Sequence, residues 1–307
     1  MLSLDELAAL DLAIWLRSGT EAARRLEVRQ STVSRRCRHC LELLQLGLEK
    51  HQEEWRLVGD RRLIVKLRQL HQLARWRGMA PLRLEGTYWS GPLLATPPPP
   101  GWIVGQCNIV GVPLPQALLR DGVIDAWLTG GPHWPEPDDP DFATLQLCTM
   151  PVHLVVTPHH PLLNQAAISW DDVIAFPSLA LPEGMYPQTE AVLRRLGLWN
   201  SPQRMRRYRH DRWEGRAEAD LSIGYATTLS EQVAGSLQRL PLPLPLQSGE
   251  ALVVRRTWAD HPACRALVAL LLERLQGWTE HCPEIEVCQP ATASATGTDP
   301  AAAGGGG

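Results

Sequence analysis

The chain has 307 residues and a mass of 34.1 kDa, more than a single hydrophobic core usually supports, so two or three domains are expected. Its composition, 44% apolar and 21% charged, is that of a soluble globular protein, and no window approaches the roughly eighteen consecutive apolar residues of a membrane-spanning helix. The net charge of −3 conceals an asymmetry, because residues 1–80 hold 15 of the 30 basic residues and only 10 of the 33 acidic ones. A basic N-terminal quarter on an acidic body predicts a nucleic-acid-binding module fused to a second unit.

The N-terminal region has the pattern of three helices. Apolar residues at helical intervals predict an amphipathic helix over residues 4–16. Ser18 or Thr20 is the expected N-cap of a short second helix, and a third helix is expected from Gln30 onward. The short second helix and the turn after it make the pair a candidate helix–turn–helix.

A long charged helix is predicted after an irregular stretch. Residues 45–60 are polar and expected to be irregular, whereas residues 60–77 predict one helix. Four apolar residues on this helix are spaced four, three and four apart, which favours a coiled-coil seam about two heptads long. They are Leu63, Leu67, Leu70 and Ala74. A helix lying on its own domain is the alternative interpretation.

After Pro81 the sequence changes to short apolar runs separated by proline and glycine, with helical stretches between some of them. This alternation predicts an α/β domain with a largely parallel sheet. Strands are expected at 82–88, 102–111, 123–129, 152–157, 221–226 and 251–255, and helices at 113–121, 188–196 and 262–276. The proline-rich residues 95–101 predict a surface loop, and residues 283–307, rich in Ala, Thr and Gly, predict a disordered tail.

The third helix carries the side chains of a DNA-reading element. It opens with Gln30, Ser31 and Thr32, and its polar faces then present Ser34, Arg35, Arg36 and Arg38. An α-helix fits the major groove of DNA, where glutamine can pair with adenine and arginine with guanine or phosphate. Arginines nearby supply the positive field that binding to the phosphate backbone needs. The alternative to a DNA-reading element is a pair of helices whose arginines lie on a solvent-exposed face and bind no DNA.

Residues 18–44 resemble the winged helix–turn–helix of LysR-type transcriptional regulators. The shared positions are Gly19, Ala22, Ala23, Leu26, Gln30, Val33, Ser34, Arg35, Leu41 and Glu42. Fainter similarities follow in the family's order at 121–131, 152–163, 221–229 and 251–275. The family's wing signature is not recognisable after Gly47.

The resemblance implies an α+β multidomain fold. It divides the chain into a winged helix–turn–helix DNA-binding domain (1–58), a dimerising linker helix (59–79), an α/β regulatory domain (80–282) and the tail (283–307). The regulatory domain would have two subdomains like those of a periplasmic binding protein, with a small effector held between them.

The resemblance also implies the site residues and partners. The DNA-binding residues would be Arg24, Gln30, Ser31, Thr32, Ser34, Arg35, Arg36 and Arg38. The effector-binding residues would be Thr87, Tyr88, Trp89, Ser90, Thr129, Gly130, Ser178 and Tyr225. The expected partners are double-stranded promoter DNA, a small-molecule effector, further copies of the chain in a dimer or tetramer, and RNA polymerase.

Other chemistry is weakly supported. No nucleophile–base pair or Gly-rich phosphate loop can be named, so neither an enzyme nor a cofactor is expected. Cys37 and Cys40 lack a second ligand pair and are interpreted as core residues rather than zinc ligands. The arginine-rich residues 204–216 predict a solvated edge strand or an anion contact. Acids at the N-terminus and the odd number of cysteines, seven, favour a cytoplasmic protein. The alternatives are a regulator with a degenerate pocket and a solute-binding module without DNA binding.

Overall fold

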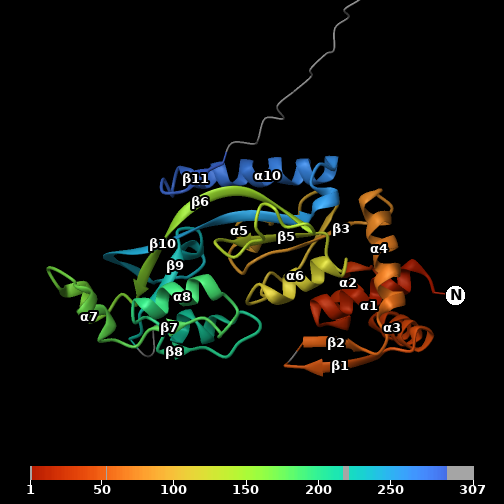
Figure 1. The fold of residues 1–307 in the computed structure, drawn as a ribbon, viewed down its shortest axis with the longest axis horizontal. Helices are drawn as coiled ribbons and strands as arrows, with labels where there is room; N and C mark the ends of the chain where they lie inside the picture. The colour runs from red at the N-terminus through yellow and green to blue at the C-terminus, as the bar shows by residue number, and fades with distance from the viewer. Residues whose placement is uncertain (1, 53, 217–220, 289–307) are drawn as a thin grey trace, which may run out of the picture.

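The computed structural model describes residues 2–52, 54–216 and 221–288. In Figure 1 a helical N-terminal unit lies at one end, a small second subdomain at the other, and a curved sheet connects them. Among the described residues, no helix combines the length and the apolar character required to cross a bilayer.

The N-terminal unit is a winged helix–turn–helix. Its helices are α1 (Leu4–Leu16), α2 (Gly19–Arg25) and α3 (Gln30–Leu44), and Ser18 rather than Thr20 caps α2 by accepting a hydrogen bond from the Glu21 amide. The expectation that α1 is amphipathic was wrong, because α1 is buried on nearly every side, between α3 and the regulatory domain.

The prediction that residues 45–60 are irregular was also wrong. They form an antiparallel hairpin, β1 (Gly47–His51) and β2 (Glu54–Val58), which is the wing. Leu48, Trp55 and Leu57 anchor it on the core of α1 and α3. Cys40 is buried in that core, and burial raises the pKa of its thiol to about 12, so it packs as a small apolar residue. Cys37 packs beside it, and burial raises its pKa to about 11.

The predicted long helix is confirmed as α4 (Arg62–Trp76), and it lies against its own chain. Ala74 and the side chains of Ile64 and Arg68 are buried. Leu67 is half-buried on the N-terminal core. Only Leu63 and Leu70 of the four predicted seam residues are well exposed, at 58% and 57%.

The regulatory domain is built on a mixed sheet, so the prediction of a largely parallel one was wrong. Among the described residues, seven strands join it in the order β11-β6-β10-β5-β3-β4, with β9 beside β6. Only β3 pairs in parallel with β4 and β5, whereas β10 is antiparallel to both β5 and β6. The strands are β3 (Leu82–Glu85), β4 (Trp102–Val104), β5 (Ala126–Gly130), β6 (Phe142–Val156), β9 (Gly224–Thr227), β10 (Gln238–Arg255) and β11 (Glu286–Val287).

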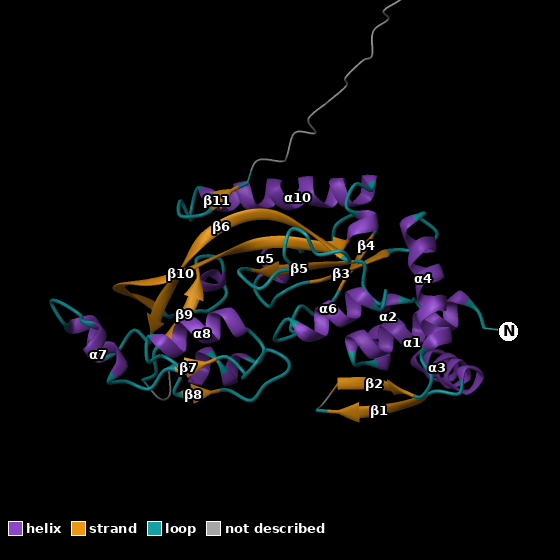
Figure 2. Ribbon diagram, in the orientation of Figure 1, coloured by secondary structure: helices purple, strands orange, loops and turns teal. Residues whose placement is uncertain are grey.

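Two long strands connect the subdomains. β6 has 15 residues and β10 has 18, and they run side by side in opposite directions along the molecule (Figure 2). Prolines within them, such as Pro151 and Pro243, interrupt the apolar runs, and therefore only their ends were expected as strands.

Helices cover both faces of the sheet. α10 (Pro262–Thr279) packs on one face through Cys264, Leu267 and Leu271. α6 (Pro113–Arg120) covers the other face, where it shares one hydrophobic core with α1 and α2. The second subdomain contains β7 (Leu179–Ala180), β8 (Ser201–Pro202), α7 (Trp170–Ile174) and α8 (Pro187–Arg195). Its own core includes Val173 of α7 and Leu193 of α8.

The predicted loop at residues 95–101 is confirmed, whereas the predicted start of the tail at residue 283 is wrong. Residues 95–101 form the predicted loop, after the short helix α5 (Ser90–Leu94). The tail does not begin at residue 283, because β11 pairs with Thr149 and Cys148 of β6. Residues 289–307 of the predicted tail lie outside the described residues.

A buried group of charges joins the N-terminal unit, α4 and the sheet. Arg75 on α4 donates two hydrogen bonds to Asp125, at 2.7 and 2.8 Å, and the backbone amide of Arg83 donates a third at 2.9 Å. Arg68 on α4 pairs with Asp11 of α1 at 2.7 Å. All five side chains are almost inaccessible to solvent, so each charge depends on the others for compensation.

Replacing Asp125 by alanine tests this group. The change leaves Arg75 buried without its carboxylate, so we expect the free energy of unfolding to fall by about 3–5 kcal/mol. Urea denaturation measures it. Asp60→Ala, which breaks the exposed pair with Arg62 and one hydrogen bond from the first amide of α4, is the control and should lower the free energy of unfolding by only about 1 kcal/mol. Equal stability of Asp125→Ala and the wild type would contradict the role given to the buried charges.

Candidate DNA-binding surface and effector cleft

The polar face of α3 is accessible. Gln30, Ser31, Ser34, Arg35 and Arg38 are exposed. The Gln30 amide donates a hydrogen bond to Ser34 Oγ at 3.1 Å. Within the described part of the chain, no ion-pair partner is found for Arg35 or Arg38, so both guanidinium groups are available to an external anion.

The other predicted DNA-binding residues are less free. Arg36 is paired with Asp5 of α1 at 2.9 Å, and Thr32 is half-buried. Arg24 is exposed but pairs with Glu21 at 2.6 Å, and this hydrogen bond lowers the pKa of Glu21 to about 2. Contact with DNA through Arg24 or Arg36 would therefore require an intramolecular ion pair to open.

A cavity of about 110 Å³ lies between the two subdomains. It brings together six of the eight effector residues expected from the sequence, which are Thr87, Tyr88, Trp89, Thr129, Gly130 and Tyr225. A Cβ atom at Gly130 would lie 2.9 Å from Trp89 Cζ2, so the glycine leaves room for the indole ring at the end of β5.

Ser90 and Ser178 do not line the cavity. Ser90 is buried beneath it, where its Oγ accepts hydrogen bonds from the Thr87 amide at 2.9 Å and the Thr87 hydroxyl at 2.8 Å. Ser178 lies within the second subdomain, and its amide donates to Asn200 Oδ1 at 2.7 Å. Ser90 therefore supports the wall of the cavity, whereas Ser178 lies apart from it.

Apart from Tyr225, the sequence missed the aromatic residues that the second subdomain contributes. Tyr186, Tyr208 and Trp213 line the cavity from segments without regular periodicity. Tyr208 stacks on Tyr88 with ring centroids 3.6 Å apart and planes inclined by 1°, so the two subdomains touch through this pair. The only sequence signal was the presence of aromatic residues among the arginines of residues 204–216.

One expectation for the arginine-rich residues 204–216, a solvated edge strand, was wrong. Arg207 is buried, because its guanidinium pairs with both carboxylate oxygens of Glu54 on the wing at 2.8 Å. The same side chain donates to the carbonyl oxygen of Trp15 at 3.3 Å. Trp15 in turn donates from Nε1 to Glu85 at 2.6 Å. The segment therefore attaches the N-terminal unit to the α/β domain of the same chain.

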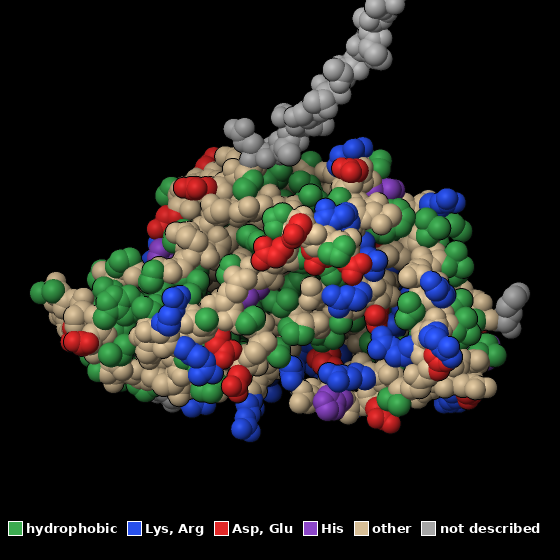
Figure 3. Space-filling model, in the orientation of Figure 1, with side chains coloured by type: hydrophobic (Ala, Val, Ile, Leu, Met, Phe, Trp, Pro, Cys, Tyr) green, Lys and Arg blue, Asp and Glu red, His purple; other side chains and the backbone are tan. Residues whose placement is uncertain are grey.

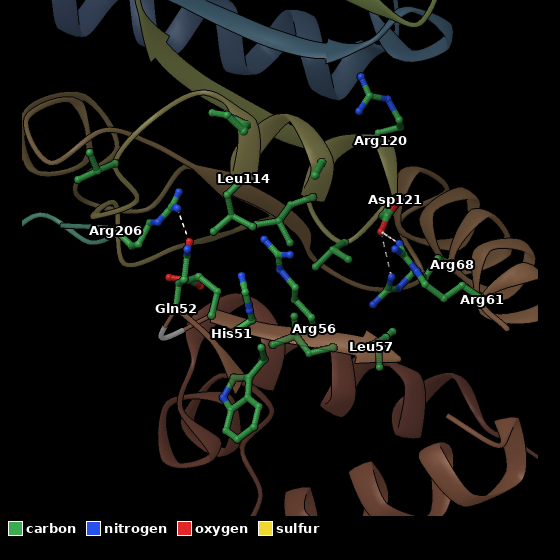
Figure 4. A pocket seen from close by; sticks show the side chains of 18 of the residues that line it. His51, Gln52, Arg56, Leu57, Arg61, Arg68, Leu114, Arg120, Asp121 and Arg206 are labelled. Atoms are coloured by element: carbon green, nitrogen blue, oxygen red, sulfur yellow. Dashed lines mark hydrogen bonds and ion pairs between the residues drawn. The ribbon is translucent and has the colours of Figure 1, made fainter. Parts of the chain in front are cut away.

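A second cavity, of about 400 Å³, separates the wing from α6. Figure 4 shows His51 and Arg56 projecting from the wing toward α6, with Arg206 bonded to Gln52 at one side. At the other side Arg61 bonds to Asp121 at 2.5 Å. Basic side chains gather at this recess in the surface view of Figure 3.

The LysR substrate binding domain family matches residues 111–276, which is more than half of the chain. The chain belongs to the LysR family of transcriptional regulators. No curated protein matches the sequence.

Solved LysR-family regulators share the fold. A variant of full-length OxyR from Pseudomonas aeruginosa is 18% identical with a TM-score of 0.53, over 88% of this chain and 95% of that one. A probable transcriptional regulator from the same organism is 16% identical with a TM-score of 0.54, over 88% and 96%. Full-length CbnR, solved with its target DNA, is 14% identical with a TM-score of 0.51, over 90% and 99%.

The contact between wing and regulatory domain in this LysR-family chain can be tested at Arg207. Arg207→Met removes the two 2.8 Å hydrogen bonds to Glu54 and leaves this buried carboxylate with Arg17 alone, at 3.3 Å, so we expect faster hydrogen–deuterium exchange in the described residues of the wing. Arg209→Ala is the control, since Arg209 pairs with Asp211 at the surface, and exchange in the wing should stay as in the wild type. Unchanged exchange in Arg207→Met would show that the wing is held by other contacts.

Proposed function

We propose that this LysR-family chain is a sequence-specific DNA-binding transcriptional regulator whose activity a small molecule controls from the cleft between the subdomains. The observation that carries the proposal is the exposed face of α3, where Gln30, Ser31, Ser34, Arg35 and Arg38 lie together without acidic partners among the described residues. The N-terminus of α3 also lacks a side-chain cap, which leaves its first backbone amides available to a phosphate.

We assign two roles to the residues of α3, contact with base edges and contact with phosphates. Gln30, Ser31, Thr32, Ser34 and Arg35 occupy the first two turns, the part of a recognition helix that reaches base edges in the major groove. Arg38 follows near the middle of the helix and, with Arg24 and Arg36, would neutralise phosphates. Effector binding in the cleft would then alter DNA bending or contact with RNA polymerase.

Paired arginine variants test this division. On DNA from immediately upstream of the protein's own gene, Arg35→Ala should weaken specific binding by about 1–3 kcal/mol and relax the preference at one base position. Arg38→Ala should weaken binding to all sequences and reduce the salt slope by about one unit. Salt-titrated binding with competitor DNA measures both effects.

The control for these variants is Arg195→Ala, which removes an exposed arginine of α8 in the second subdomain. It should bind as the wild type does. If Arg35→Ala keeps the full affinity and sequence preference of the wild type, the assignment of α3 as recognition helix is wrong.

We propose in addition that α4 joins two copies of the chain. Leu63 and Leu70 lie seven residues apart on one face of α4 and are exposed, which is unusual for two large apolar side chains one heptad apart. The opposite face is already committed to the buried arginines Arg68 and Arg75. A second copy of α4 would cover the exposed leucines.

Sedimentation velocity tests the dimer. Leu70→Glu places a charge in the proposed seam and should convert the dimer to a monomer. Gln69→Glu adds the same charge to the same helix outside the seam and should leave the dimer intact. A Leu70→Glu protein that remains dimeric would contradict the proposed interface.

A further inference from the structure

We infer that the cleft between the subdomains takes a small organic cation, such as an alkylammonium or guanidinium group, rather than an anion. This inference rests on the proposed function, because it names the effector class of the same cleft. Three observations carry it, namely the aromatic walls, the buried carboxyl groups behind those walls, and the absence of a positive charge among the described residues that line the cavity.

Aromatic rings from both subdomains enclose the cavity. Tyr88, Trp89, Tyr186, Tyr208, Trp213 and Tyr225 all line it. The electron-rich faces of such rings attract cations, and the attraction grows when water is excluded. Proteins commonly bind alkylated ammonium groups in such cages of aromatic rings.

Two buried glutamates stand directly behind these rings. Glu250 on β10 accepts a hydrogen bond from Trp89 Nε1 at 2.5 Å, and Glu214 accepts one from the Tyr208 hydroxyl at 2.5 Å. The second carboxyl oxygen of each is buried with no hydrogen-bond partner in the described part of the chain. The hydroxyl of Tyr225, which lines the cavity, is also without a partner among the described residues. Neither glutamate lines the cavity itself, so both act on a ligand through the rings that they hold, whereas the Tyr225 hydroxyl can accept a hydrogen bond from a ligand N–H group directly.

In the part of the chain that the structure describes, no compensating positive charge faces the cavity. Among the described lining residues there is neither lysine nor arginine. His133 is the one basic side chain in the described lining, and burial lowers its pKa to about 4, so it is neutral at pH 7. Arg207, which directly precedes the lining residue Tyr208, is committed to Glu54. A carboxylate ligand would therefore lose its hydration without gaining a counter-charge.

Cation binding should be linked to a proton at Glu250. Burial raises the pKa of Glu250 to about 8, so its carboxyl group is largely neutral at pH 7. The titratable neighbour on β6 is Cys148, and burial raises the pKa of its thiol too, so it stays protonated. Because a bound cation favours the ionised glutamate, affinity should rise as the pH increases from 6.5 to 8.5, with proton release near pH 7.

The test compares n-propylammonium with propionate, which have the same size and opposite charge, by isothermal titration calorimetry on the full chain. We expect saturable binding of n-propylammonium, no binding of propionate, and an affinity that rises with pH. Glu250→Gln should weaken n-propylammonium binding at pH 8.5 by about tenfold and remove the pH dependence. Glu286→Gln, which alters an exposed glutamate of β11, is the control and should change neither.

Contrary outcomes have separate meanings. Propionate binding that Trp89→Leu abolishes would overturn the cation assignment and leave an effector cleft in place. Binding of neither probe would overturn the cation assignment as well. A failure of the proposed function would show itself separately, as loss of sequence-specific DNA binding by the ligand-free wild type.

Discussion

The buried ion pairs between α4, α1 and the sheet constrain everything else in the molecule. Three arginines and two aspartates are withdrawn from water there. Arg68 and Arg75 can be tolerated only while their carboxylates stay within hydrogen-bond distance, whereas Arg83 lies 3.9 Å from Asp11 and donates to the Val123 carbonyl oxygen at 2.9 Å. His71, which contacts Arg75, is kept neutral because burial lowers its pKa to about 3. The linker helix therefore cannot slide or rotate alone, and the DNA-binding unit and the first subdomain hold one orientation.

The same two chain segments that line the effector cleft also hold the DNA-binding unit. Glu85 receives the Trp15 indole N–H and stands two residues before Thr87, which lines the cavity. Arg207 binds the wing through Glu54, and the adjacent Tyr208 closes the cavity by stacking on Tyr88. A change in the separation of the subdomains must therefore act directly on contacts to α1 and the wing. A movement at the cleft can therefore reach the wing through the adjacent residues Arg207 and Tyr208, without a series of further contacts.

Helices were predictable from the sequence to a degree that strands were not. The periodicity of residues 60–77, 113–121, 188–196 and 262–276 located helices that the structure confirms, because the burial of one helix face leaves a local pattern. The helix predicted over residues 4–16 is confirmed too, although it is buried on nearly every side. The pairing of β6 with β10 is a contact between residues far apart in the chain, and no local period encodes its direction. The burial of Arg68 and Arg75 could not be predicted from the sequence either, because their helix has the composition of a charged, solvent-exposed helix. Their partners, Asp11 and Asp125, are brought beside them only by the tertiary fold.

The two candidate sites differ in the same way. The DNA-binding surface is one helix, and its residues are neighbours in sequence as well as in space, so the composition of residues 30–38 alone was enough to propose it. The cleft is assembled from strand ends and irregular segments. The strand ends, Thr87 to Trp89 and Thr129 to Gly130, were found by family resemblance, whereas Tyr186, Tyr208 and Trp213 come from segments whose positions depend on the tertiary fold. These aromatic residues and the glutamates behind the walls give the cleft its charge preference. The identity of the effector is therefore encoded in the part of the site that local sequence patterns describe least.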